Sequence, residues 1–129
     1  MKKLFQKYII TKWPAIIWSV IIFILLAMPP VTIPNEKKLD LYQFDKVIHI
    51  SLFGLLVVLI GFYLRPKYKS VSEFLLILSC IVILASSYGI AMEYVQLYVG
   101  RDFDVKDMMA DAVGAVLGWL FFAIKDKPR

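Results

Sequence analysis

Four long apolar runs alternate with short polar segments along the chain. The runs cover about residues 9–28, 47–64, 74–99 and 108–124. Each has roughly the length that an α-helix needs to cross about 30 Å of hydrocarbon. Lipid offers no hydrogen-bond partners to a backbone, so only helices and closed barrels can span it, and these runs are too long and continuous for barrel strands. The pattern predicts an all-α integral membrane protein, with a single domain over 1–129 that forms a four-helix transmembrane bundle.

Composition agrees with a lipid environment. Hydrophobic residues make up 60% of the chain, whereas soluble domains have about 45–50%. The net charge of +5 comes from basic residues at the ends of the apolar runs rather than on one polar face, so no nucleic-acid partner is expected. The one cysteine, Cys80, lies within an apolar run. It excludes an intramolecular disulfide and is predicted to be a small packing residue.

The distribution of basic residues predicts the orientation in the membrane. Ten flank one set of run ends: Lys2, Lys3, Lys7, Lys12, Arg65, Lys67, Lys69, Lys125, Lys127 and Arg129. Five flank the other set: Lys37, Lys38, Lys46, Arg101 and Lys106. Since cytoplasmic loops carry the excess of lysine and arginine, both termini are predicted to be cytoplasmic. The N-terminal run mimics a signal peptide but lacks a clear small-x-small cleavage site, which favours an uncleaved first helix.

Ten charged or strongly polar residues gather at the predicted outer ends of the runs. They are Asp45, Lys46, His49, Glu93, Gln96, Arg101, Asp104, Lys106, Asp107 and Asp111. A charge at the centre of a membrane helix costs roughly 2.5–3.5 kcal/mol on insertion scales. Such a cluster is therefore expected to pair internally, line a wet cavity or act on a ligand.

Helical spacing brings these residues onto shared faces. Asp45 and Lys46 lie four and three residues before His49, so all three share one face of the second helix. The third helix has one face with Gly89, Glu93, Gln96 and Gly100. The fourth has a seam within an arc of about 80°, formed by Asp104, Asp107, Asp111, Gly114 and Gly118. We expect Gly89, Gly114 and Gly118 to allow close approach of neighbouring helices.

Each polar residue also has a purely structural interpretation. Asp104 fits an N-cap, with Asp107 in the first turn of the following helix. His49 fits a structural partner for a carboxylate, and Arg101 an anchor at the membrane interface. Glu93 has no such explanation, because it lies well inside an apolar helix without a capping role.

At these residues the sequence resembles the VanZ-like family of small bacterial membrane proteins. The matching pieces are Asp45-Lys46-x-x-His49 with Phe53, Glu93-x-x-Gln96, Arg101-x-x-Asp104-x-x-Asp107 and Gly114-x-x-x-Gly118. One departure is Asp111, where many members carry asparagine. The resemblance implies a multi-pass protein of the bacterial cytoplasmic membrane, and the family's namesake is associated with teicoplanin resistance. It implies a phenotype rather than a reaction.

Three functions are open from the sequence. In the first, the polar cluster binds or shields a lipid-linked cell-wall intermediate or a lipoglycopeptide, with Lys46, His49 and Arg101 facing a phosphate. The second is a small intramembrane hydrolase or transferase, whose catalytic candidates are His49, Glu93 and Asp107. The third, a transporter or channel subunit, requires oligomers.

Cofactor motifs are missing from the sequence. It has no P-loop, dinucleotide fingerprint or Ser/Cys nucleophile motif, and no cofactor is expected. One divalent-cation version remains open, with oxygen ligands suited to Mg²⁺ or Ca²⁺ from Glu93, Asp104, Asp107 and Asp111. A single histidine and a single cysteine argue against a structural zinc site.

Overall fold

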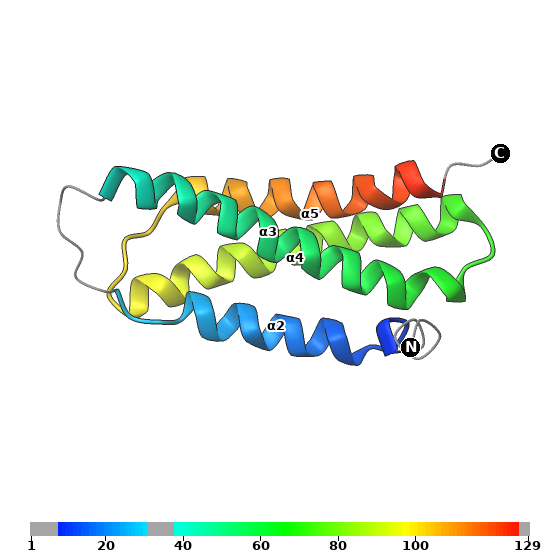
Figure 1. Ribbon diagram of the computed structural model, residues 1–129, viewed down its shortest axis with the longest axis horizontal. Coiled ribbons are helices and arrows are strands. Elements are labelled where there is room, and N and C mark those ends of the chain that lie inside the picture. Colours follow the sequence, from blue (N-terminus) through cyan, green and yellow to red (C-terminus); the bar gives the residue numbers. More distant parts are fainter. Residues whose placement is uncertain (1–7, 31–37, 127–129) are drawn as a thin grey trace.

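The computed structural model describes residues 8–30 and 38–126, and within them the regular structure is entirely helical. Its elements are α2 (Trp13–Leu26), α3 (Lys38–Leu64), the 3₁₀ turn η2 (Arg65–Lys67), α4 (Val71–Tyr98) and α5 (Val105–Lys125). The helices lie lengthwise beside one another and alternate in direction along the chain (Figure 1). The predicted all-α class is confirmed.

The predicted number of four membrane spans is not confirmed. In the described part of the chain, three helices are long and apolar enough to cross a membrane, namely α3, α4 and α5. The predicted first span, residues 9–28, forms the 14-residue helix α2. At 1.5 Å per residue, α2 covers about 21 Å, so a fourth span stays a prediction.

The three long helices begin before their predicted first residues. Helix α3 begins at Lys38 instead of residue 47, α4 at Val71 instead of 74, and α5 at Val105 instead of 108. Hydropathy marks only the apolar part of a helix, whereas polar first turns continue it where they are capped or paired. Ser70 accepts a hydrogen bond from Glu73 N (3.4 Å), and the predicted N-cap Asp104 is confirmed by its bond from Lys106 N (2.8 Å).

Glycines bring α3 and α5 into backbone contact. A Cβ atom added to Gly114 would overlap the backbone carbonyl of Ile50. One added to Gly118 would lie 2.7 Å from the carbonyl oxygen of Gly54. Gly89 of α4 meets Asp111 in the same way, since its Cβ would lie 2.5 Å from a carboxylate oxygen. Gly89, Gly114 and Gly118 therefore lie at close approaches between helices, and Gly54 lies at one as well.

The helix α2 packs less closely than the others. Two side-chain hydrogen bonds attach it, from Trp18 Nε1 to Leu52 O (2.9 Å) and from Tyr88 Oη to Ser19 O (2.9 Å). Its outward face is apolar and exposed, with Ile16, Ile17, Val20, Phe23 and Ile24. Cys80 of α4 is exposed as well. Its predicted packing role is therefore wrong, because the side chain points out of the bundle.

The two ends of the bundle differ in charge. At the end with η2 and the last turn of α5 lie Arg65, Lys67 and Lys125, and Arg65 Nε bonds Asp126 Oδ2 at 2.6 Å. The predicted polar cluster lies at the opposite end, where α3 and α5 begin and α4 stops. The basic residues that flank the apolar runs predicted this separation of the basic end from the polar cluster. Which of the two ends faces the cytoplasm stays a prediction.

Candidate functional site

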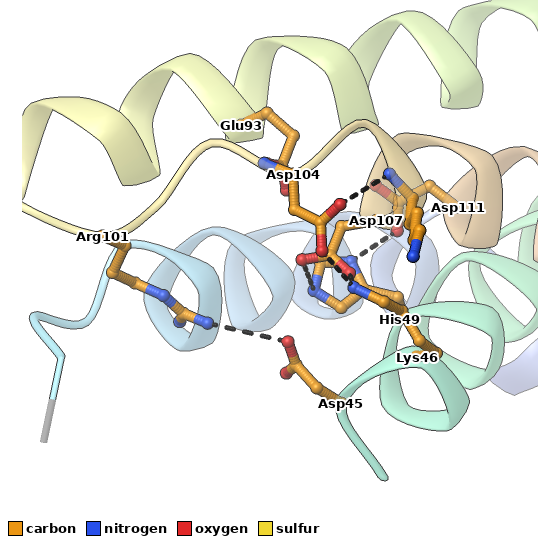
Figure 2. Close-up of polar contacts among 9 residues, drawn as sticks. Asp45, Lys46, His49, Glu93, Arg101, Asp104, Asp107 and Asp111 are labelled. Carbon is orange, nitrogen blue, oxygen red and sulfur yellow. Dashed lines mark hydrogen bonds and ion pairs between the residues drawn. The ribbon is translucent and has the colours of Figure 1, made fainter. Parts of the chain in front are cut away.

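Side chains from α3, α4, α5 and the α4–α5 connection meet at the polar end (Figure 2). Five of them are buried, with exposed fractions from 0% to 4%: His49, Glu93, Gln96, Asp107 and Asp111. Ionisable groups are almost never fully buried in proteins unless they are paired. The contacts within this cluster therefore decide what it can do.

Lys46 links the start of α3 to the start of α5. Its ammonium lies 2.7 Å from Asp104 Oδ2 and also bonds Asp107 Oδ1. Asp107 therefore pairs first with Lys46, and its Oδ2 lies 3.9 Å from Nε2 of His49.

His49 forms a buried pair with Asp111. Its Nδ1 lies 2.8 Å from Asp111 Oδ1, and both side chains are fully buried. A carboxylate only accepts hydrogen bonds, so Nδ1 carries the hydrogen. In a neutral imidazole the lone pair then lies on Nε2, which makes no hydrogen bond in the described part of the chain. This nitrogen can accept a proton or bind a metal ion.

Glu93 fixes the position where α5 begins. Its Oε2 accepts a hydrogen bond from the backbone N–H of Asp104 at 2.9 Å, while Oε1 has no partner among the described residues. One turn later, the backbone carbonyl of Gln96 accepts from Arg101 N (2.9 Å). Between them Gly100 has a φ of 87°, which favours glycine. These contacts hold the α4–α5 connection against the cluster.

Arg101 and Asp45 stand at the rim of a pocket. Their charged groups are 3.9 Å apart, and both side chains are partly exposed. The pocket has a volume of about 250 Å³ and is lined by Pro30, Asp45, Gly100, Arg101, Asp102, Asp104 and Asp107. Asp107 belongs both to this wall and to the buried cluster, so it connects the pocket with His49 behind it.

The pocket wall includes residues that the sequence did not single out. Pro30 follows α2, and Asp102 lies exposed beside Arg101. Lys106, which was part of the predicted cluster, is exposed at the start of α5. The predicted ligand-binding set otherwise meets at this end of the bundle.

The carboxylates of the cluster outnumber its permanent cations. Lys46, Arg101 and the exposed Lys106 are the cations, and the carboxylates come from Asp45, Glu93, Asp104, Asp107 and Asp111. The cluster is therefore suited to an additional cation. Three of its residues, Asp45, His49 and Asp107, bring potential metal-ligating atoms within 4.8 Å of one another. This set shares only Asp107 with the four carboxylates considered from the sequence, because Asp104 pairs with Lys46 and Asp111 with His49.

Comparison with known proteins places the chain in a family. No curated protein and no solved structure matches it. A family model described as VanZ/LLP1 matches residues 5–126, nearly the whole chain. The apolar helices fit a VanZ-like membrane protein, and the chain belongs to the VanZ/LLP1 family.

Proposed function

We propose that this VanZ-like membrane protein binds a lipid-linked molecule of the bacterial cell envelope at its polar pocket. The pocket would lie at the outer face of the cytoplasmic membrane and hold a phosphate-containing head group. Binding or shielding this molecule would contribute to envelope function or to resistance against teicoplanin. The position of Arg101 in the pocket wall carries the proposal.

Arg101 suits an anionic head group for two reasons. A guanidinium binds phosphate through two parallel hydrogen bonds, which gives both affinity and orientation. Its contact with Asp45 is long, at 3.9 Å, and both groups are partly exposed. A phosphate can therefore replace Asp45 without breaking a short buried ion pair.

The lipid chain of such a molecule would meet apolar surface further along the bundle. Pro30, which follows α2, lines the pocket. A groove of about 200 Å³ between α2, α3 and α4 is lined by Ser19, Leu56, Ile60, Ile81, Leu84, Ala85 and Tyr88. A head group at Arg101 and a lipid chain in this groove would use one polar and one apolar surface of the protein.

Antibiotic susceptibility tests this function. A sensitive Gram-positive host would express wild type, Arg101→Ala or the matched control Arg65→Ala at equal membrane levels. Arg65 is also a half-exposed arginine in an ion pair, but at the opposite end. We expect protection against teicoplanin, which carries a lipid tail, and none against vancomycin, which does not. Arg101→Ala should lose this protection and Arg65→Ala should keep it. Equal protection by both variants would contradict the proposal.

An enzymatic role is the second candidate, favoured by the buried pair of His49 and Asp111. A histidine oriented by a carboxylate, with its second nitrogen unbonded, is arranged as a general base. It would activate water or an acceptor hydroxyl against a lipid-linked phosphate, with Arg101 stabilising the developing negative charge. Turnover of a polyprenyl pyrophosphate by the purified protein, abolished in His49→Ala, would support this role. Binding of that lipid without turnover would leave the first proposal.

A further inference from the structure

We propose that Asp45, His49 and Asp107 bind one divalent transition-metal ion, of the Zn²⁺ or Mn²⁺ class. The proposal goes beyond the proposed function, because it concerns the protein alone and needs no lipid ligand. It rests on the position of three ligand atoms and on one buried nitrogen without a hydrogen bond.

The three ligand atoms are almost close enough to share an ion. They lie within 4.8 Å of one another, and the pair His49 Nε2 and Asp107 Oδ2 is 3.9 Å apart. Around a tetrahedral ion with bonds of about 2.0–2.2 Å, ligand atoms are roughly 3.4 Å apart. Small rotations close the difference, and Asp45 at the partly exposed rim has room for the largest one.

His49 has the arrangement of a metal ligand. The ring is fully buried, and Nε2 makes no hydrogen bond within the described ranges. A buried polar atom without a partner costs about 1–3 kcal/mol, so such an atom needs an explanation. The other nitrogen is held by Asp111 at 2.8 Å. Metal-bound histidines almost always donate their second N–H to such a carboxylate, which fixes the tautomer and directs the lone pair at the ion.

The carboxylate of Asp107 is oriented for the same ion. Lys46 binds Oδ1 of Asp107, and the other oxygen, Oδ2, is the one that faces His49. Asp45 and Asp107 also line the pocket. An ion held by three protein ligands keeps coordination positions open, as in catalytic rather than structural metal sites. Those positions would point to the pocket.

The ligand types select the class of metal. One imidazole nitrogen with two carboxylate oxygens suits Zn²⁺, Mn²⁺ or Fe²⁺, whereas Mg²⁺ and Ca²⁺ prefer oxygen ligands alone. Thiolate-dependent sites are not an option, because Cys80 lies on the exposed face of α4.

Metal titration of the purified protein tests the site. Wild type would be stripped with a chelator, held in detergent, and titrated with Zn²⁺, Mn²⁺ and Mg²⁺ in a calorimeter. We expect one Zn²⁺ or Mn²⁺ ion per chain, and affinity at least about tenfold lower in His49→Ala, Asp45→Asn and Asp107→Asn. Asp102→Asn is the matched control, since this exposed carboxylate lines the pocket outside the ligand set. It should bind like wild type.

Asp111 gives a second, independent readout. Removal of a carboxylate that orients a metal-bound histidine lowers metal affinity by about 10–100-fold. Asp111→Ala should show this loss, while Asp111→Asn, whose amide oxygen still accepts from Nδ1, should lose less. The absorption spectrum of bound Co²⁺ should change with both variants. A spectrum that Asp111→Ala leaves unchanged would contradict coordination by His49.

Three outcomes of the titration would also overturn the proposal. The first is a wild type that takes up none of these ions. The second is binding that His49→Ala leaves unchanged. The third is binding that prefers Mg²⁺ and depends on Glu93 and Asp104, which would indicate the all-carboxylate set instead. Asp45 is partly exposed, so Asp45→Asn remains informative if variants of the buried ligands fail to fold.

Discussion

The two ends of the bundle differ in how their charged side chains are buried and paired. At the η2 end, Arg65 and Asp126 form a short ion pair at 2.6 Å, with exposed fractions of 31% and 16%. At the other end, four buried side-chain atoms lack a hydrogen bond among the described residues: His49 Nε2, Glu93 Oε1, Gln96 Nε2 and Asp111 Oδ2. The ion pair at the η2 end is complete and partly exposed, whereas the polar end keeps buried polar atoms without partners behind a partly exposed rim.

This difference separates anchoring from function. A half-exposed ion pair stabilises a protein little, but it also costs little to maintain. Buried polar atoms without partners cost about 1–3 kcal/mol each and are expected to serve another purpose. The polar end is therefore the candidate site, and the η2 end serves as its internal control.

The largest expected effect concerns the glycine contacts that hold the polar end together. Gly114→Ala places a methyl group on the backbone carbonyl of Ile50, which cannot rotate away. At Gly61, towards the η2 end, the atoms nearest to the added methyl belong to the side-chain ring of Phe122 rather than to backbone. We expect Gly114→Ala to lower the free energy of unfolding by about 3 kcal/mol and Gly61→Ala by about 1 kcal/mol. Unfolding in detergent, followed by circular dichroism, measures both, and equal losses would contradict backbone contact at Gly114.

The next effect is expected at the buried pair of His49 and Asp111. Asp111→Ala leaves the buried Nδ1–H of His49 without its acceptor at 2.8 Å. The loss of stability should be about 2 kcal/mol. Asp111→Asn keeps an acceptor oxygen and should be milder. If alanine and asparagine cost the same in thermal unfolding, the hydrogen bond is not what stabilises this pair.

A smaller effect concerns ligand binding rather than folding. Arg101→Ala should weaken binding of a lipid-linked phosphate by about tenfold, or about 1.5 kcal/mol, because one charge-assisted contact is lost. Stability should stay near that of wild type, since Arg101 is partly exposed. Arg65→Ala provides the comparison at the opposite end. Flotation with vesicles containing a polyprenyl phosphate measures binding, and a similar loss in both variants would indicate general attraction to anionic lipid.

The smallest effect should come from the η2 end. Asp126→Asn weakens the pair with Arg65, whose guanidinium also donates to Tyr68 O and lies over the ring of Phe74. We expect a loss of about 0.5 kcal/mol, because the pair is half-exposed and screened. Unfolding at low and high salt checks this. A loss above about 2 kcal/mol would place this end among the main stabilising contacts.

Much of the fold was predictable from the hydropathy pattern that membrane-spanning helices require. Continuous apolar runs predicted the three long helices but placed the start of α5 at residue 108, and only the N-cap interpretation of Asp104 matched the observed start at Val105. The inward faces were harder to predict, because lipid and protein core are both apolar and hydrophobic residues do not distinguish them. Glycines and charges did mark those faces, as at Gly114 and Glu93. Cys80 has neither a glycine nor a charge beside it to indicate which way it faces, and its exposure was not predicted.

The composition of the site was predictable, but its pairing was not. Helical spacing placed Asp45, Lys46 and His49 on one face, and the structure agrees. The partner of Asp107 depends on the relative height and rotation of α3 and α5, which the glycine contacts at Gly54 and Gly114 determine. The relative height and rotation of two helices cannot be predicted from the residue spacing within each helix. For the same reason the metal-ligating set differs from the four carboxylates that spacing alone would select.

The ion pair between Lys46 and Asp107 has a consequence for biogenesis. Of the three long helices, α5 is the least hydrophobic, and it carries the buried acids Asp107 and Asp111. Their partners, Lys46 and His49, lie on α3, which leaves the ribosome before α5. A helix with uncompensated carboxylates inserts poorly on its own. Stable insertion of α5 should therefore depend on α3 already lying in the membrane, so that the last helix enters as a partner of the second rather than independently.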